Sequence, residues 1–502
     1  MKKHSTVSRR DFMKIIGLGA AGVGAVAAPA FTDLDDAMAS KSAGFQRSWY
    51  VKEKDMPTVE IDWPKIQRMD NRKTFHGNTT WLDLIGKEKY DDWLAKGTQI
   101  QRDNIANNVP GNTLKDVALL SASGAYLHEP TRFIQQPISW PNPWAAPPIY
   151  MWQGAPLPEY FGAAKYEGTP LENSRMMRSA LRFLGASQVG FSVLDENTKK
   201  LIFTRHCRPI DGLAEKYIQY ESGIAKGYET NTAYILPDKQ LYVISIALQM
   251  SKELFRQGHS ILRTCGNGSR YYHWAGVQNR AQALLNGLGY TGYGYPIRHW
   301  GLMSAEADAV LSGMSEMSRN SNVTISPEFG SVAGYFTLIT DLPLEPTKPI
   351  DAGMFRFCHT CKKCAQSCPV EAISFDDEPT WEPNYSTLSG CETAPPTWSI
   401  PGKKTFYRDE PRCFTKWQYP FCAICMGGCT FNINDVAGVH ELVKATLSNT
   451  SLLNGFFWRA DSFYGFGTTE DAAKGDWWDK SLPTYGYDTS VGAFDGGYRR
   501  AK

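Results

Sequence analysis

The feature that most constrains this chain is a pair of cysteine sets in its last third. The first set has the spacing Cys-x2-Cys-x2-Cys-x3-Cys-Pro and comprises Cys358, Cys361, Cys364, Cys368 and Pro369. This spacing is typical of a run that gives three thiolates to one [4Fe–4S] cube and its fourth to a neighbouring cube. The second set comprises Cys413, Cys422, Cys425 and Cys429. Two sets therefore predict two clusters with exchanged fourth ligands, and a protein that moves electrons.

Each predicted cluster receives four cysteines. The first cluster is expected to bind Cys358, Cys361, Cys364 and Cys429. The second is expected to bind Cys413, Cys422, Cys425 and Cys368. A zinc ribbon is the alternative, because paired Cys-x2-Cys units also bind zinc. Four cysteines within eleven residues, closed by proline, favour iron–sulfur cubes.

The second set is less regular than the first. Eight residues separate Cys413 from Cys422, and Thr430 stands where a proline would follow Cys429. Cys391 is an alternative first ligand, although we favour the closer Cys413. The cysteines outside the predicted clusters are Cys207, Cys265 and Cys391. We expect these three to be buried thiols, because their odd number argues against a disulfide framework.

The N-terminus predicts export. Residues 8–14 (SRRDFMK) match a twin-arginine signal, and a weakly apolar stretch follows over residues 15–30. Ala37-Met38-Ala39 has the small-x-small form of a signal-peptidase site, so residues 1–39 are the predicted signal peptide. The apolar stretch is short for a membrane span, which needs about twenty residues. Since this route carries folded proteins, we expect a redox enzyme at the outer face of the cytoplasmic membrane.

Composition limits the partners. Lys and Arg total 53 against 51 for Asp and Glu, so no strong charge predicts a nucleic-acid partner. The aromatic residues, 15 Trp, 24 Tyr and 24 Phe, suit either an ordinary core or a buried site for a flat cofactor. No long hydrophobic segment follows the signal. We therefore expect a partner to hold the protein at the membrane.

The chain before the cysteines predicts a mixture of helices and strands. Residues 135–158 are rich in proline and loop-like. We expect a helix at residues 172–184 and strands at residues 189–194, 200–203 and 241–248. Trp274, Val277, Ala281, Leu284 and Leu288 recur at helical spacing, in a helix ended by Gly287 and Gly289. Residues 264–269 (TCGNGS) are expected to form a Gly-rich loop. The fold class is α+β.

The electrons need an acceptor that these patterns do not reveal. No Gly-x-Gly-x-x-Gly follows a strand, which excludes the usual flavin and nicotinamide fingerprint. No Cys-x2-Cys-His site for haem attachment occurs either. Either another cofactor is bound or the clusters pass electrons to another protein.

The order of these features resembles that of the respiratory reductive dehalogenases. A twin-arginine signal, a large domain and the segment at residues 341–353 (DLPLEPTKPIDAG) precede two ferredoxin-like cysteine sets. The resemblance runs from Ser8 to about Tyr487. It includes Trp63, residues 165–170 (KYEGTP) and residues 327–330 (PEFG). Many ferredoxins share the cysteine spacing, but its combination with the signal and the Thr-Lys-Pro-Ile-Asp linker is far more specific.

The resemblance implies a fold, cofactors and partners. Residues 40–345 would form a nitroreductase-like α/β domain that holds a base-off corrinoid (cobalamin) without the Asp-x-His-x-x-Gly motif, which is absent here. Residues 346–445 would form a bacterial-ferredoxin-like domain with two [4Fe–4S] clusters, and residues 446–502 a C-terminal segment packed on the core. The substrate would be a small chlorinated aliphatic hydrocarbon. The implied partners are a small integral membrane anchor protein and a quinone-linked electron donor.

The resemblance also implies site residues. The family's proton-donating tyrosine matches Tyr271, which we expect at the N-terminal edge of the amphipathic helix, where the helix dipole favours a phenolate; its rival is Tyr272. Where relatives place an arginine or lysine after the PEFG motif, this chain has Gly334, so Arg298 is the predicted cation. Arg319 is expected to anchor either the structure or the corrinoid.

Two other functions compete with dehalogenation. A relative of epoxyqueuosine reductase would share corrinoid and clusters but act on tRNA, which the export signal and balanced charge disfavour. A plain exported ferredoxin-type electron-transfer subunit would leave roughly 300 residues before the clusters unexplained. Cobalt and iron analysis would separate these readings.

Overall fold

A computed structural model describes most of the chain. The described residues are 48, 50–74, 82, 85–120, 131–135, 157–206, 215–297, 299–321, 323–383, 385, 399, 401–417, 422–432, 438–463 and 467–482. Helices and strands alternate through them, which confirms the predicted α+β class. Among these residues, none of the helices has the length and apolar character needed to cross a membrane. The predicted signal peptide lies outside the described residues, as does most of the proline-rich segment at residues 135–158.

A four-stranded antiparallel sheet forms the centre of the molecule. Its strand order is β2-β6-β8-β7. The strands are β2 (Gln188–Leu194), β6 (Leu241–Gln249), β8 (Ala333–Thr340) and β7 (Gly292–Tyr293). Ile244 on β6 pairs with Phe191 on β2 and with Leu338 on β8. Every residue of β8 is buried, which confirms that this is an interior sheet. Two predicted strands, residues 189–194 and 241–248, are β2 and β6.

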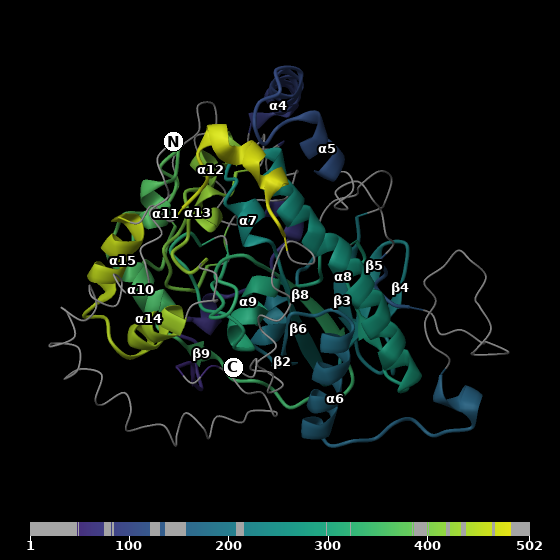
Figure 1. Cartoon of the computed structure of the whole chain (residues 1–502). Helices are drawn as coiled ribbons and strands as arrows, with labels where there is room; N and C mark the ends of the chain where they lie inside the picture. The colour runs from purple at the N-terminus through teal and green to yellow at the C-terminus, as the bar shows by residue number, and fades with distance from the viewer. Residues whose placement is uncertain are drawn as a thin grey trace.

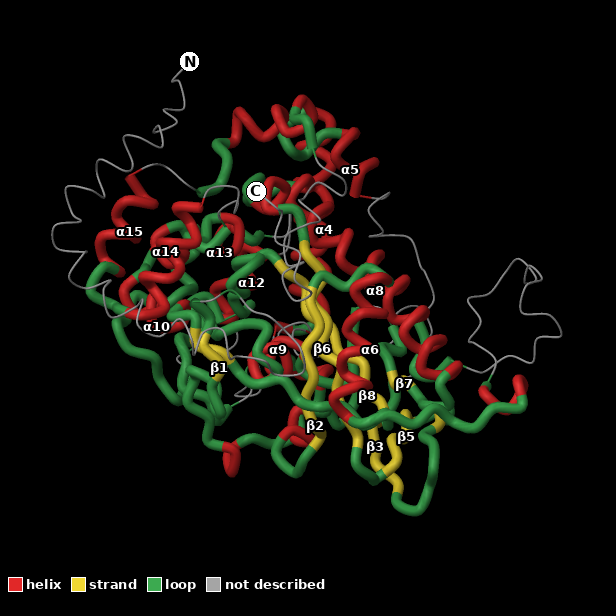
Figure 2. Tube along the Cα trace, turned by 60° about the horizontal axis from the view of Figure 1, so that its bottom comes forward, coloured by secondary structure: helices red, strands yellow, loops and turns green. Residues whose placement is uncertain are grey.

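One face of the sheet is covered by α6 (Pro170–Phe183) and α8 (Ile261–Gly287). Alternate strand residues point to this face because successive side chains on a strand point to opposite sides. Ile244, Ile246 and Phe336 therefore share one core with Trp274 and Val277 of α8. This is the stripe that the helical spacing predicted. Figure 2 shows α6 and α8 beside these strands.

The opposite face is covered by α9 (Ala305–Leu311). Ala305 and Ala309 pack against Ala247 of β6 and Tyr335 of β8. The small alanine side chains let the helix lie close to the sheet. Helices on both faces thus leave the sheet buried, and its residues read as nearly continuous apolar runs.

The start of α6 shows how local sequence fixes a helix. Thr169 is the N-cap, and its hydroxyl accepts a hydrogen bond from the Glu172 backbone N–H at 3.3 Å, while the Glu172 carboxylate accepts from the Thr169 N–H at 2.9 Å. Pro170 occupies the first helical position, where its missing N–H costs nothing. The KYEGTP segment is thus a helix start, and the helix predicted at residues 172–184 is confirmed within two residues.

Two local predictions are wrong. The strand expected at residues 200–203 is instead a 3-10 helix, Thr198–Leu201, followed by a single β-bridge at Ile202. The Asp195 carboxylate accepts from the backbone N–H groups of Asn197 and Thr198, which turns the chain there.

The Gly-rich loop expected at residues 264–269 is also wrong, because these residues lie inside α8. Ser260 caps the helix by accepting from the Arg263 N–H at 3.2 Å. Gly266 is needed for packing, since a Cβ there would lie 3.0 Å from the Leu254 Cβ. The glycines therefore allow close contact with α7 (Lys252–Phe255) rather than forming a turn.

The cysteine-bearing segment gathers on the side of the molecule away from α6, with α13 (Ile424–Gly427) packed on α7 (Figure 1). Its helices are α10 (Met354–Thr360), α11 (Lys363–Gln366), α12 (Glu410–Trp417), α13, α14 (Gly438–Asn449) and α15 (Asn454–Phe463). The predicted linker ends in β9 (Ile350–Asp351), which pairs with β1 (Lys52–Glu53). Tyr50 and Val59 share a core with Phe357. The N-terminal segment therefore packs on the cysteine region, and the boundary at residues 345/346 stays a prediction.

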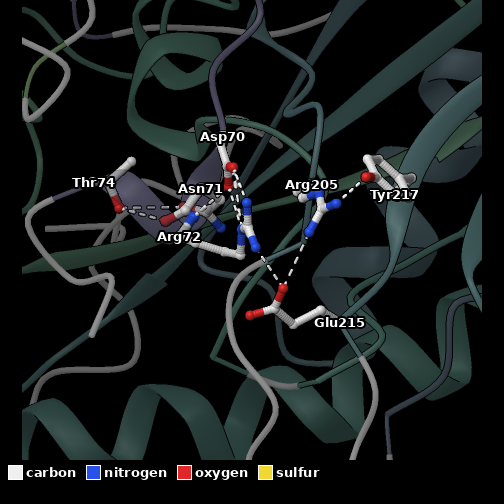
Figure 3. Close-up of polar contacts among 7 residues, drawn as sticks. All are labelled: Asp70, Asn71, Arg72, Thr74, Arg205, Glu215 and Tyr217. Carbon is white, nitrogen blue, oxygen red and sulfur yellow. Dashed lines mark hydrogen bonds and ion pairs between the residues drawn. The ribbon is translucent and has the colours of Figure 1, made fainter. Parts of the chain in front are cut away.

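A polar network ties the early chain to a smaller sheet (Figure 3). This sheet contains β3 (Tyr217–Glu221), β5 (Ala233–Pro237) and β4 (Tyr228–Glu229). Arg72 bonds Asp70 at 2.6 Å and Glu215 at 2.5 Å, and Arg205 bonds Glu215 at 3.2 Å. Arg205 also donates to the Tyr217 hydroxyl. The converging arginines hold three separate segments together.

Candidate active site and cysteine centres

The first cysteine run is joined by the last cysteine of the second set. Burial raises the pKa of Cys358, and the neighbouring Cys361 and Cys429 raise it further. Burial also raises the pKa of Cys364 well above its usual value, with contributions from Cys358, Cys361, Cys425 and Cys429. A thiol feels such effects only from charges close to it. The fold thus brings Cys429 to the first run, as the exchanged-ligand assignment requires.

The second group forms in the same way. Burial raises the pKa of Cys413, on α12, to about 12, and Cys422 and Cys368 add to the shift. The pKa of Cys425 is raised by burial and then by Cys422, Cys413 and Cys368. Cys368 therefore lies within electrostatic range of Cys413 and Cys425, on the side of the second set. Cys391, the alternative to Cys413, lies outside the described residues.

The described residues outside these two groups include one further cysteine. Cys265 is buried, and its Sγ lies 3.3 Å from the carbonyl oxygen of Ile261. Burial raises its pKa to about 12, so it is an inert thiol, as expected for a cysteine outside the clusters. Cys207 lies outside the described residues.

Positive charges and N–H donors surround the cysteine groups. Arg408 is buried in an ion pair with Glu410; burial lowers its pKa, but Cys413 and Glu410 outweigh this and raise it. Burial lowers the pKa of Arg263 to about 10, and Cys422 opposes that shift. The backbone N–H of Ala372 donates to the Cys368 Sγ at 3.3 Å. These groups favour negative charge on sulfur.

Thr430 follows Cys429 at the position where Pro369 follows Cys368, and it makes contacts that a proline could not. Thr430 places its hydroxyl 3.7 Å from the Cys361 Sγ and 3.2 Å from an Asp461 carboxylate oxygen. Lys363 forms an ion pair with the same carboxylate. A threonine hydroxyl therefore links the first cysteine group to a buried charge pair, which a proline could not do.

Arg319 holds the backbone around the first run. Its guanidinium donates to the carbonyl oxygens of Cys358 at 2.8 Å and His359 at 3.1 Å. It also donates to those of Ser374 at 2.8 Å and Asp376 at 2.7 Å. Four of its five N–H groups are thus used by the polypeptide. The contacts support the anchoring role expected for Arg319, whereas its contact with a corrinoid stays a prediction.

The PEFG motif joins the sheet to the cysteine region. Ser331, directly after it, donates its backbone N–H to the Asn432 side chain at 2.9 Å. The Ser331 hydroxyl donates to the Met426 carbonyl at 2.9 Å, and Lys444 donates to the Pro327 carbonyl at 2.7 Å. The motif therefore holds the segment with the second cysteine set against the start of β8.

Tyr271 lies inside α8, about three turns from its start. The expectation that it stands at the helix edge is wrong, because α8 begins at Ile261, so the N-terminal dipole does not reach it. Its ring is half-buried between His299, at a centroid distance of 4.2 Å, and Phe336, at 5.9 Å. Tyr272, its rival, is 43% exposed. Neighbouring rings thus fix Tyr271, whereas Tyr272 lies at the surface.

Two arginines that the sequence did not single out lie on the same helix as this tyrosine, one in contact with it and one within electrostatic range. Arg270 donates an N–H to the Tyr271 hydroxyl at 2.7 Å. Arg263 lies within electrostatic range of Cys422, Cys425, Arg270 and Tyr271. The sequence feature that could have identified them is the pair of arginines that precedes Tyr271 on the same helix. The predicted cation, Arg298, lies outside the described residues.

Neither cysteine group is arranged to hold a single metal ion. Within the ranges that the structure describes, no three His, Cys, Asp or Glu side chains are placed to hold a single metal ion. A cavity of about 630 Å³ is lined by Pro369, Lys416 and Ile424, among others, and so lies beside the second cysteine group. Tyr271 does not line it.

Comparison with known proteins identifies the class. The reductive dehalogenase subunit family matches residues 46–344, more than half of the chain. The protein therefore belongs to the reductive dehalogenase family and is an oxidoreductase. The family predicted from the cysteine sets, linker and signal is confirmed.

Relatives match nearly the whole chain. The trichloroethene reductive dehalogenase of Dehalococcoides mccartyi is 28% identical over 98% of this chain and 99% of its own length. The tetrachloroethene reductive dehalogenase of Sulfurospirillum multivorans is 24% identical over 97% and 96%. An epoxyqueuosine reductase of Bacillus subtilis is 34% identical but matches only 14% of this chain. The match to the epoxyqueuosine reductase is therefore local.

Solved structures share the fold. A catabolic reductive dehalogenase in complex with 3-bromo-4-hydroxybenzoic acid has a TM-score of 0.55 at 17% identity, over 85% of this chain and 50% of that one. A reductive dehalogenase whose structure suggests a mechanism for B12-dependent dehalogenation has a TM-score of 0.54 at 16% identity. This chain spans about half the length of these solved dehalogenases.

Proposed function

We propose that this reductive dehalogenase removes halogen from a small chlorinated aliphatic hydrocarbon, using two [4Fe–4S] clusters and a corrinoid. The observation that carries the proposal is the pairing of two four-cysteine groups with a held tyrosine, Tyr271, on the neighbouring helix α8. The relatives named for trichloroethene and tetrachloroethene support chlorinated ethenes as the substrate class.

The cysteine groups fit iron–sulfur cubes. Each group supplies four sulfurs, and burial raises the thiol pKa values, so an unliganded site would hold crowded neutral thiols. Iron binds thiolates, and Arg263, Arg408 and Lys363 lie close enough to balance the negative charge. We assign the cysteines to the two clusters as the sequence predicted, in a bacterial-ferredoxin-like domain.

The structure supports an order for electron transfer. The second group is linked to Tyr271, because Arg263 is within electrostatic range of Cys422, Cys425 and Tyr271 together. Helix α13, which carries Cys425, packs on α7, directly before α8. Electrons would therefore enter through the first cluster and leave through the second.

The surroundings of Tyr271 fit a polar ligand such as a corrinoid. The Arg270 Nε atom is buried and finds no hydrogen-bond acceptor among the described residues, so a bound ligand could supply one. When bound, the corrinoid supplies the reduced cobalt that cleaves a carbon–halogen bond. The likeness to a B12-dependent dehalogenase supports a nitroreductase-like corrinoid domain around the central sheet.

Tyr271 is the proposed proton donor. Replacing carbon–halogen by carbon–hydrogen consumes two electrons and one proton and releases a halide ion. A phenol carries one O–H that it can donate. His299 and Phe336 fix the Tyr271 ring, which holds the donated proton in one position.

We further propose export by the twin-arginine route and attachment to the outer face of the cytoplasmic membrane. The SRRDFMK segment and the small-x-small site at residues 37–39 support export. A small integral membrane protein would anchor the enzyme, and a quinone-linked donor would supply its electrons.

Metal analysis tests the proposal. Anaerobically purified protein should contain about eight irons, from two four-iron cubes, and one cobalt per chain. Four irons would contradict the second cysteine group. Iron without cobalt would instead support an electron-transfer subunit.

A further inference from the structure

We propose that Arg270 is a positioning residue that directs the Tyr271 proton towards the substrate and stabilises the phenolate left behind. This inference rests on the proposed function of Tyr271 as the proton donor. Neither the cysteine motifs nor the relatives' names assign a role to Arg270.

The contact between Arg270 and Tyr271 is unusual for adjacent residues of one helix. Neighbours in a helix point about 100° apart and do not normally face each other. Here the Arg270 side chain curls back, so that its Nη2 lies 2.7 Å from the Tyr271 hydroxyl oxygen and its guanidinium 4.6 Å from the ring centroid.

Gly334 makes this conformation possible. A Cβ at this position would lie 2.5 Å from the Arg270 Cδ, closer than real atoms approach, and 3.2 Å from the Arg270 Cβ, which is a tight contact. The aliphatic part of Arg270 therefore lies directly over the bare backbone of β8. Phe336, on the same face of that strand, contacts the Tyr271 ring. Strand β8 thus receives both side chains of the pair.

The direction of the hydrogen bond decides its chemical use. A guanidinium has only donors, so the Tyr271 oxygen must accept. The phenol's own proton is not spent in this contact and stays available for a substrate carbon. Once the proton leaves, the bond becomes charge-assisted on both sides and strengthens. Arg270 therefore stabilises the product of proton transfer more than the starting phenol.

Other charged groups face this pair. Burial raises the pKa of Glu306, at the start of α9, and Arg270 opposes that shift. Arg263 adds a second positive charge from the preceding turns of α8. The His299 ring contacts the Tyr271 ring at a tilt of 51°. Glu306 therefore balances part of the positive charge beside the tyrosine.

The test moves the positive charge from position 270 on α8 to position 334 on β8. Arg270→Gln should lower kcat by roughly ten- to a hundredfold with little change in KM, the worth of one hydrogen bond to a charged group. Arg270→Ala combined with Gly334→Arg should recover much of this loss, since the new side chain takes the vacated space. Arg280→Gln, an exposed arginine on the same helix, is the matched control. Iron content should be unchanged in all variants, and turnover is compared per bound cobalt, because Arg270 also lies beside the proposed corrinoid site.

A double-mutant cycle and a spectroscopic signal separate positioning from packing. In a Tyr271→Phe background, Arg270→Gln should cost nothing further. With 3-fluorotyrosine at position 271 of the oxidised holoenzyme, the fluorine resonance should move in Arg270→Gln and return in the relocation variant. An equal loss in both backgrounds, or an unmoved resonance, would overturn the inference.

The same cycle shows which proposal has failed. Full turnover of Tyr271→Phe would overturn the proton-donor assignment and this inference with it. Lost turnover in Tyr271→Phe with full turnover in Arg270→Gln would overturn the inference alone.

Discussion

Glu316 should make the stability of this protein depend on pH near neutrality. Its buried carboxylate accepts from the backbone N–H groups of Ala352 and Met354, each at 3.0 Å, and from the Thr58 hydroxyl at 2.9 Å. It thereby joins the N-terminal segment, the sheet region and the linker before the first cysteine run. Burial, followed by repulsion from Asp351, raises its pKa from 4.5 to about 7.

The sign and size of the effect follow from this shift. Because the pKa is raised in the folded state, protonation favours folding. The contribution is complete below pH 4.5 and is lost as the pH rises through about 7. The rise of the Glu316 pKa from 4.5 to about 7 corresponds to about 3 kcal/mol of free energy of unfolding. About 1 kcal/mol of this is lost between pH 6 and pH 8.

Glu316→Gln replaces the carboxyl with a group that does not titrate. The wild-type Tm should fall relative to that of the variant between pH 6 and pH 8, by about 2 °C or less for a chain of this size. Scanning calorimetry under anaerobic conditions measures this difference. Glu88→Gln, on the exposed helix α4 (Lys87–Ala106), controls for the loss of one negative charge. Parallel pH profiles for wild type and Glu316→Gln would refute the reasoning.

Five substitutions test the site in three comparisons. Cys413→Ala should remove one of the two cluster signals in electron paramagnetic resonance, whereas Cys391→Ala should keep both; the reverse would exchange the ligands. Tyr271→Phe should lower turnover by roughly two to four orders of magnitude at unchanged iron and cobalt, and Tyr272→Phe far less; equal losses would remove the distinction between them. Arg319→Ala leaves four carbonyls without their donor, so it should lower Tm and iron content by destabilising the first cluster loop; unchanged values for both would show that the loop does not need it.

Local patterns predicted several elements well. Helix α6 was visible because its capping residues and apolar spacing lie within one short segment, and β2 and β6 because buried strands are nearly continuous apolar runs. The errors arose where a neighbour overrides the local preference. Gly266 reads as a loop residue until α7 is known to pack against it. The Asp195 carboxylate stabilises a turn before residues 200–203, where the apolar residues predicted a strand.

The sequence by itself predicted the two iron–sulfur clusters, because close cysteine spacing fixes which sulfurs a short backbone turn can present together. It also determined the family, through motifs that recur in order along the chain. Only the tertiary structure decided that the bare backbone of Gly334 accommodates the Arg270 side chain that donates to Tyr271, and that Ser331 contacts Asn432. These contacts join segments far apart in the chain, and nothing in the spacing of one segment specifies the position of the other. Packing of the sheet against α8 supplies that information.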